Sequence, residues 1–311
     1  MRTLIIDGHN AGWRLAKKMP MLTTNGRPVQ VVYGLLTMVH GLLAQFTPDV
    51  AIMCWDTDHS AYRKKIFPDY KANRHHFKSE KDQRAYNSTI AQMKEAEAIL
   101  SQMNVAQLIF PKTEGDDLMA MVCQQTGGWR TIVSSDMDMF QLVGDGIDVW
   151  SPIKTLLYNR SNFRQREGLS PQQFLQLRAA CGDVSDNIPG IARGVGEVTI
   201  RQLLAKYESV DRLFDPKIEK KVVQMGTRYA SLYTDGSKQA YFRNLLLMDL
   251  SISSENHPEK EAVTKTVQEA IRRRVKIDLK AVKQMFIENS FQSLLRDFAK
   301  WVLPFENLDR E

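Results

Sequence analysis

Short apolar runs alternate with longer stretches of helical character over about the first 160 residues of the chain. The runs have the length of buried strands. They cover residues 3–6, 50–55, 107–110, 131–134 and 147–150. The helical stretches between them lie near residues 30–46, 86–103 and 116–126. Strands that alternate with helices predict an α/β fold, in which a mostly parallel central sheet carries helices on both faces.

The pattern becomes mainly helical in the second half of the chain. A Ser-Pro pair opens a predicted helix at 170–181, and residues 199–300 continue with helical character. We therefore expect two domains, an α/β domain over residues 1–165 and a mainly helical domain over residues 166–311.

Acidic residues gather where the predicted elements end or begin. The set is Asp7, Asp56, Glu114, Asp116, Asp117, Asp136, Asp138, Asp183 and Asp186. Ligands of open α/β sheets bind beyond the carboxyl ends of the strands, where most of these acids fall. Without a cation such acids would repel each other and take up protons, whereas Mg²⁺ or Mn²⁺ prefers oxygen ligands. One acid alone could be a helix cap, but the whole set predicts a metal centre.

Charge and composition narrow the class of protein. The chain has 311 residues, 43% of them hydrophobic and 25% charged, and its net charge is +6. A basic protein with a concentrated acidic pocket suits a polyanionic substrate whose scissile phosphate meets metal. Three cysteines in apolar contexts indicate reduced thiols. Because we find no signal peptide and no apolar run of membrane length, we expect a cytoplasmic protein with no membrane partner.

A basic and aromatic segment follows the second predicted strand, at about residues 60–90. Between Tyr62 and Arg84 it holds eight lysines and arginines against three acids, with aromatic residues among them. Phosphate attraction together with base stacking would suit a nucleic-acid single strand. The candidate contacts are Arg63, Tyr70, Lys78, Lys81 and Arg84. The alternative is a solvated charged loop without a ligand.

A glycine-rich stretch at about residues 182–204 separates two predicted helices. Gly190, Gly194 and Gly196 would let the backbone approach a phosphate, and the helix that follows would direct its N–H groups at it. Arg193 lies between these glycines and is a further candidate contact. The alternative is an ordinary packing element of two helices and a turn.

Six motifs in order resemble those of the 5′-nuclease superfamily of flap endonucleases and 5′→3′ exonucleases. They are IIDGHN, FPDYKANR, EGDDLMA, SSDMDMFQL, GDVSDNIPG and YFRNLLLMDL. The superfamily includes the 5′-nuclease domain of bacterial DNA polymerase I and stand-alone phage enzymes, among them the phage RNase H. The resemblance runs from Asp7 to about Asp249, and the last 60 residues carry little of it. Because the chain contains no recognisable polymerase, we expect a stand-alone enzyme of phage origin.

The resemblance implies a structure-specific 5′ nuclease that cuts 5′ ends, flaps or primers on duplex DNA with two Mg²⁺ ions, in primer or flap removal during replication. It implies that the first seven acids of this set, from Asp7 to Asp138, belong to the sheet domain and bind metal there. Asp183 and Asp186 would bind metal from the helical domain. Lys71 and Arg74 resemble the family's catalytic pair, which reaches the scissile phosphate from an arch-like segment, here at about residues 60–90. Tyr70 resembles an aromatic residue near the substrate strand. In the free protein we expect Lys71 to be disordered or displaced, and to become ordered when a 5′ single strand enters.

The resemblance also makes residues 182–204 a helix–hairpin–helix that grips duplex DNA, often with a K⁺ ion. Two departures weigh against that ion, because an extra residue separates the glycines and Val198 replaces a lysine. The expected partners are DNA, RNA/DNA hybrids and replication proteins, and the expected state is a monomer in a bacterial or phage-infected cell.

The residues also leave other functions possible. One is a branched-DNA-binding protein that has lost catalysis, although the acid set shows no gap. Another is a small toxin-like ribonuclease, which the helical half of the chain disfavours. An aspartyl phosphatase would need a second aspartate two residues after Asp7, where the chain has His9.

Overall fold

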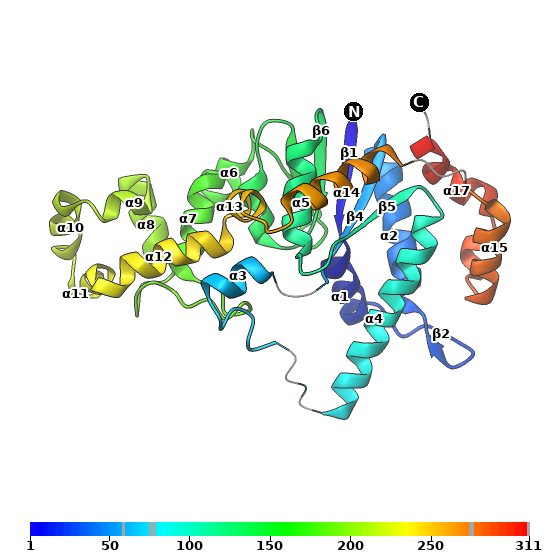
Figure 1. The fold of residues 1–311 in the computed structure, drawn as a ribbon, viewed down its shortest axis with the longest axis horizontal. Helices are drawn as coiled ribbons and strands as arrows, with labels where there is room; N and C mark the ends of the chain where they lie inside the picture. Colours follow the sequence, from blue (N-terminus) through cyan, green and yellow to red (C-terminus); the bar gives the residue numbers. More distant parts are fainter. Residues whose placement is uncertain (58–59, 75–76, 78, 274–276, 310–311) are drawn as a thin grey trace.

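A six-stranded sheet forms the centre of the computed structural model (Figure 1), which describes residues 1–311 except 58–59, 75–76, 78, 274–276 and 310–311. Its strand order is β5-β4-β1-β6-β7-β8. The pairs from β5 to β7 are parallel, and only β8 runs antiparallel, beside β7. The strands are β1 (Arg2–Asp7), β4 (Val50–Trp55), β5 (Val105–Ile109), β6 (Trp129–Val133), β7 (Ile147–Ser151) and β8 (Leu156–Tyr158). The sequence prediction of a mostly parallel sheet is confirmed.

Helices cover both faces of this sheet, as the sequence predicts. Alternate residues of β1 supply the two faces, since Leu4 and Ile6 belong to one buried core and Ile5 to the other. The first core packs against α1 (Gly8–Lys18), α2 (Gln30–Phe46) and α4 (Glu80–Ser101), and the second against α5 (Gly115–Gln125) and α14 (Lys260–Arg272). A short hairpin of β2 (Thr23–Thr24) and β3 (Arg27–Pro28) precedes α2. Each large aliphatic side chain buried in this way contributes roughly 1.5–3 kcal/mol relative to exposure.

The basic segment after β4 is partly helical. It contains α3 (Ala61–Ile66), a turn region over residues 67–74, and the first turns of α4, which begins at Glu80 because the hydroxyl of Ser79 accepts the N–H of Asp82. The sequence pattern placed this helix start six residues later.

The second half of the chain is mainly helical, as expected. Besides α14, its helices after the 3₁₀ helix η1 (Met137–Leu142) are α6 (Phe163–Glu167), α7 (Pro171–Cys181), α8 (Glu197–Tyr207), α9 (Val210–Leu213), α10 (Pro216–Val223), α11 (Thr227–Ala230), η2 (Ser231–Tyr233), α12 (Asp235–Met248), α13 (Leu250–Glu255), α15 (Leu279–Glu288), α16 (Gln292–Leu295), α17 (Phe298–Glu306) and η3 (Asn307–Asp309). Helix α7 has a complete capping box at Ser170 and Gln173, with Pro171 in its first turn. It ends at Gly182, whose φ of +74° and contact with the Ile188 carbonyl leave no room for a side chain.

The last helices return to the sheet. Helix α17 packs against α2, where the rings of His40 and Trp301 stack with centroids 4.9 Å apart, and Phe286 and Phe305 are fully buried in the same core as β1. Figure 1 shows this end of the chain on the opposite side from α8–α12. The expected domain boundary at residues 165/166 stays a prediction, but the C-terminal helices share a core with the first domain.

The structure also places the three cysteines and shows the lengths of the apolar helices. Cys54 and Cys123 are buried, Cys181 is half-buried, and none of the three forms a disulfide. Within the described residues, no helix has both the length and the apolar character needed to cross a lipid bilayer.

A buried ion pair joins the basic segment after β4 to the sheet domain. The guanidinium of Arg63 on α3 donates to both carboxylate oxygens of Asp117 on α5, at 2.6 and 2.8 Å, and its Nε donates to the carbonyl of Leu247 on α12 at 2.7 Å. Ser253 adds a hydrogen bond to the same carboxylate. Arg63 and Asp117 are only 2% and 1% exposed, so solvent scarcely screens the pair.

We expect Arg63→Ala to lower the free energy of unfolding by about 3–5 kcal/mol, because it leaves the carboxylate of Asp117 buried without a counter-charge. Urea denaturation would measure this loss. Arg84→Ala is the matched control, since Arg84 forms an exposed pair with Glu80 and should change stability by less than about 1 kcal/mol. Equal denaturation midpoints for both variants would contradict the structural role of Arg63.

Candidate metal centre

Four of the nine acids lie together at the carboxyl edge of the sheet without a lysine or arginine partner among the described residues. Asp7 ends β1, Asp56 follows β4, Asp116 lies in the first turn of α5, and Asp136 caps η1 after β6. The order β4-β1-β6 makes three of these strand ends adjacent. In the described chain, no lysine or arginine forms an ion pair with any of the four, although the imidazole of His9 lies 3.7 Å from Asp56.

Backbone and hydroxyl groups orient these carboxylates. The N–H of Asn10 and the hydroxyl of Ser134 donate to Asp7 at 3.0 and 2.8 Å. The N–H of Gly115 donates to Asp56 at 2.6 Å, and a Cβ at this glycine would lie only 3.2 Å from the same oxygen. The carboxylates of Asp7 and Asp56 are therefore held in place by these bonds.

Burial and mutual repulsion raise the pKa of three of these acids. Burial raises the pKa of Asp7 to about 7, with a further contribution from the charge of Asp56. Burial raises the pKa of Asp136 to about 6, and the charge of Asp138 adds to this. The pKa of Asp116 also rises well above its usual range, through burial and then the charges of Asp136 and Asp7. This donor set fits a hard divalent cation, whose charge would remove the repulsion.

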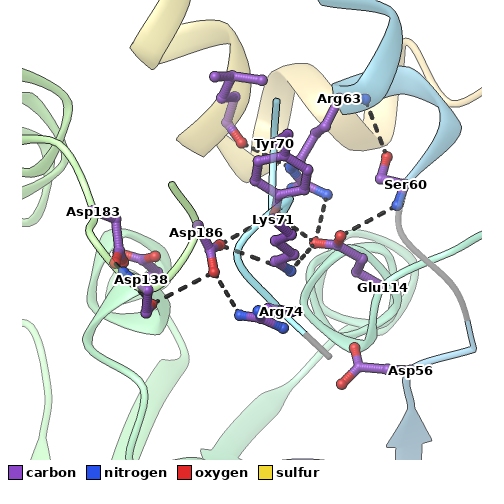
Figure 2. Close-up of polar contacts among 12 residues, drawn as sticks. Asp56, Ser60, Arg63, Tyr70, Lys71, Arg74, Glu114, Asp138, Asp183 and Asp186 are labelled. Carbon is purple, nitrogen blue, oxygen red and sulfur yellow. Dashed lines mark hydrogen bonds and ion pairs between the residues drawn. The ribbon is translucent and has the colours of Figure 1, made fainter. Parts of the chain in front are cut away.

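Lysine or arginine side chains form ion pairs with the other five acids. Lys71 Nζ lies 2.8 Å from Glu114 Oε2 and 3.7 Å from Asp186 Oδ2, and the hydroxyl of Tyr70 donates to the same two acids (Figure 2). Burial alone would raise the pKa of Glu114, but the charges of Arg63 and Lys71 outweigh it and lower that pKa to about 2. Glu114 is therefore held as a carboxylate, in contrast to Asp7.

Arg178 bridges two further acids, and sequence reasoning missed it. From the last turn of α7 its Nε donates to Asp138 Oδ1 at 2.8 Å, and its NH2 donates to Asp183. Asp183 also accepts the N–H and hydroxyl of Ser185, and these bonds with Arg178 lower its pKa against the opposing effect of burial. The sequence feature that could have identified Arg178 is its position one turn before Gly182 and Asp183, where α7 ends.

The paired acids leave little room among them. The crevice lined by Glu114, Asp138, Asp183 and Asp186 measures about 10 Å³. Among the described residues, no three Asp, Glu, His or Cys side chains are arranged to hold a metal ion directly. An ion would therefore enter with rotation of the carboxylates and displacement of the lysine or arginine side chains that now contact them.

The turn region 67–74 docks on the acidic loop 183–187 through the backbone as well. The N–H of Lys71 donates to the carbonyl of Asp186 at 2.9 Å, Asn73 Nδ2 donates to the carbonyl of Val184 at 2.9 Å, and Asn187 Nδ2 donates to the carbonyl of Asp69 at 2.8 Å. Arg74 adds an ion pair with Asp186. The two segments, more than 100 residues apart in sequence, thus form one unit.

Three expectations from the sequence differ from this arrangement. Lys71 is 7% exposed and paired with acids, so it is not displaced from them. Tyr70 is 2% exposed, so its ring cannot stack on a substrate strand in this conformation. Arg63 is equally buried in its pair with Asp117, so it cannot contact nucleic acid here. The cause is common to all three, because buried carboxylates recruit the nearest donors.

The remaining candidate contacts among the described residues are exposed. Lys81 and Arg84 are exposed on α4, Arg193 is exposed in the loop between α7 and α8, and Lys78 lies outside the described residues. Gly194 has a φ of +77° and no atom within 4 Å of the place where a Cβ would lie, and Gly196 is the N-cap of α8. Gly190 instead packs against the Cys181 carbonyl, 2.7 Å from where its Cβ would lie, so packing explains that glycine.

Several known proteins are similar to this chain in sequence or in fold. A 5′-3′ exonuclease of Aquifex aeolicus is 28% identical over 312 residues, covering 94% of this chain and all of the relative. DNA polymerase I of Thermus aquaticus is 32% identical over 216 residues, or 68% of this chain but only 25% of the polymerase. The solved structure of the T5 5′-exonuclease with bound zinc ions covers 88% of this chain and all of that chain, with a TM-score of 0.74 at 21% identity, a likeness of fold.

The family model described as the N-terminal resolvase-like domain of 5′-3′ exonucleases matches residues 2–168, which is more than half of the chain and includes seven of the nine acids. The motifs, the parallel sheet and the acids at its carboxyl edge agree with that match. The protein therefore belongs to the 5′-3′ exonuclease family.

Proposed function

We propose that the protein is a structure-specific 5′ nuclease that hydrolyses phosphodiester bonds at 5′ ends, flaps or primers on duplex DNA with divalent metal ions. The observation that carries this proposal is the group of Asp7, Asp56, Asp116 and Asp136, which concentrates uncompensated negative charge in a chain of net charge +6. A buried group of this kind serves metal chemistry rather than stability. The name of the relative that this chain covers over its full length, a 5′-3′ exonuclease, supports the same activity.

We assign metal binding to eight of the nine acids. The four unpaired acids would hold one Mg²⁺ ion, and Glu114, Asp138, Asp183 and Asp186 would complete the site of a second, with Mn²⁺ able to take the same ligands. Asp117 is different, because Arg63 engages both of its oxygens; we reassign both residues to holding α3 on the sheet domain. When bound, two such ions supply an activated water and neutralise charge at the leaving oxygen.

Lys71 and Arg74 would act on the phosphate. Both now contact carboxylates that a divalent ion would compete for. Once released from Glu114 and Asp186, their positive charges would face the phosphoryl oxygens while remaining anchored by the backbone bond between Lys71 and Asp186. The same competition would keep the site in an ion-paired form until metal and substrate arrive.

The DNA itself would contact two surfaces. The loop between α7 and α8, with Arg193, Gly194 and the N–H groups at the start of α8, suits a duplex backbone. The exposed cations of α4 suit the single strand. The proposal also includes a K⁺ ion at the loop between α7 and α8, and action on RNA/DNA hybrids. We further propose a monomer that works with replication proteins, a cytoplasmic location and a phage origin.

A DNA-binding protein without catalysis is the second candidate, because the described residues form no ready-made metal site. A 5′-labelled flap substrate incubated with Mg²⁺ or with EDTA separates the two. A 5′ nuclease releases a labelled fragment only with Mg²⁺, whereas the alternative binds the flap equally and releases nothing. A toxin-like ribonuclease has no counterpart to α7–α13 and would cut unstructured RNA instead.

We expect Asp136→Ala to abolish flap cleavage in single-turnover assays while DNA binding persists. Loss of a metal ligand should remove several kcal/mol of transition-state stabilisation, and the lost negative charge removes repulsion of DNA. Asp145→Ala is the matched control, because Asp145 is exposed and pairs with Arg160 away from this edge. A cleavage rate above about a tenth of wild type would contradict the assignment.

We expect Lys71→Ala to lower the single-turnover rate on a 5′ flap by on the order of 10²-fold, comparable to the loss of a preorganised charge donor. The dissociation constant for DNA should change little, since one cation makes one phosphate contact among several. Lys65→Ala, an exposed lysine of the same segment, is the control. If affinity falls and the rate of the bound complex does not, Lys71 is a docking residue rather than a catalytic one.

Replacing Lys78, Lys81 and Arg84 together with alanine should weaken the salt dependence of DNA binding. Each lost phosphate contact lowers the slope of log affinity against log salt by roughly one unit. The control is the alanine triple at Lys280, Lys283 and Lys300, which lie exposed on α15 and α17. An unchanged slope in the first triple would mean that the α4 cations form only a solvated surface.

A further inference from the structure

A single buried side chain bonds to the backbone on both sides of the acidic loop 183–187. It is Asn244 of α12, whose exposed fraction is 0%. Its Nδ2 donates to the carbonyl of Ala179, in the last turn of α7, and to the carbonyl of Pro189, just after the loop, both at 2.8 Å. One amide group therefore joins the two ends of a segment that carries two of the nine acids.

The neighbouring residue fixes the orientation of this amide. The Nε and Nη2 groups of Arg243 donate to Asn244 Oδ1 at 3.2 and 2.9 Å. Because a guanidinium can only donate, the amide oxygen faces Arg243 and both amide hydrogens face the two carbonyls. The same guanidinium lies over the ring of Phe67, 4.7 Å from its centroid, and so connects α12 to the turn region 67–74. Helix α12 packs along both α7 and α3 (Figure 1).

The loop needs such support from outside. None of residues 183–187 is buried, and Val184 is 88% exposed, so apolar burial contributes little to the position of the loop. Two backbone bonds between Asp183 and Ile188, each 2.8 Å long, close the loop at its base. They define the shape of the loop, whereas the bonds from Asn244 define its place relative to α7 and α12.

The ion pairs on this loop would not hold it once a metal ion binds. Lysine and arginine side chains now contact Asp183 and Asp186, and a divalent ion would compete with them for the same carboxylates. The bonds of Asn244 differ, because they join an uncharged amide to backbone carbonyls. An arriving cation leaves those bonds intact. The amide can therefore hold the loop in both the ion-paired and the metal-bound form.

We propose that Asn244 is a positioning residue for the second metal ion, since it holds Asp183 and Asp186 where they can share that ion with Glu114 and Asp138. This inference rests on the proposed function, which assigns these four acids to one ion. Removal of a group that orients a metal ligand typically lowers metal affinity 10–100-fold. Because Asn244 acts through the backbone of the loop, we expect the lower end of that range.

The test is a calorimetric titration of the full chain with Mn²⁺ in the absence of DNA. Asn244→Leu keeps the shape of the side chain and removes both donors. We expect two binding events in the wild-type protein, of which Asn244→Leu weakens one about tenfold and leaves the event at the four unpaired acids unchanged. Asn244→Ser retains a single donor and should give a smaller loss in the same event, which carries the test if Asn244→Leu does not fold.

Two further variants separate positioning from a general loss of stability. In Asp183→Asn/Asp186→Asn the same event is already impaired, so adding Asn244→Leu should lower Mn²⁺ affinity no further. Asn289→Leu is the matched control, because Asn289 is 4% exposed and its amide is also bonded through both atoms, but at the end of α15, on the opposite side of the molecule from α8–α12 (Figure 1). It should leave both events unchanged.

Three results of these titrations would overturn the proposal. The first is normal binding of both ions by the folded Asn244 variants. The second is an equal weakening of both events, which would mean that the amide stabilises the whole site rather than the loop. The third is the same selective loss in Asn289→Leu.

Amide hydrogen exchange examines the loop without metal. With EDTA present, the N–H groups of Asp183 and Ile188 should exchange about tenfold faster in Asn244→Leu than in the wild-type protein, and at the wild-type rate in Asn289→Leu. Equal exchange in wild type and Asn244→Leu would overturn the proposal. If exchange rises as expected while the wild-type protein binds no Mn²⁺ and cuts no flap, Asn244 holds the loop and the proposed nuclease function is what fails.

Discussion

The repulsion among carboxylates at one edge of the sheet is the constraint to which the surrounding structure responds. The parallel strands deliver Asp7, Asp56 and Asp136 to neighbouring positions, and α5 adds Glu114, Asp116 and Asp117. Buried like charges raise one another's pKa and destabilise the folded state unless something compensates them. The chain compensates only part of the set, with Arg63, Lys71, Arg74 and Arg178. The acids left over are the ones best suited to a divalent cation.

This compensation also joins distant parts of the chain. Arg63 connects α3 to α5 and α12, and the turn region 67–74 is bonded through its backbone to the loop 183–187. The basic segment that would contact substrate is thereby anchored on the loop that would complete a metal site. A change in either one must be felt by the other, since they share Glu114 and Asp186 as partners. Such shared partners give a physical basis for coupling substrate placement to metal binding.

The site is therefore a band along the sheet edge rather than a single pocket. At one end the loop after α7 presents backbone N–H groups and Arg193, in the middle lie the acids, and at the other end α4 presents the exposed cations Lys81 and Arg84. This order matches the chemistry of a polyanion that passes from paired to unpaired form across a scissile phosphate.

Local sequence was enough to predict the sheet, the major helices and the acids at the strand ends. These follow from short-range rules: apolar runs such as residues 50–55 must be buried, their carboxyl ends must meet when strands are parallel, and Ser170-Pro171 starts a helix. The same rules explain why the start of α4 was predicted too late: it begins at Glu80 because of the cap at Ser79, which lies in a run with the composition of a polar loop.

Which cation pairs with which acid, in contrast, depends on the tertiary structure. Arg63, Tyr70 and Lys71 look like surface contacts in a basic run, yet each is buried because an uncompensated carboxylate lies within reach in the fold. The bridge made by Arg178 and the amide bonds of Asn244 arise from contacts between elements far apart in sequence, as does the packing of α17 on α2. Hydrophobic periodicity carries no information about such pairings, because the energy of a buried charge depends on its three-dimensional neighbours.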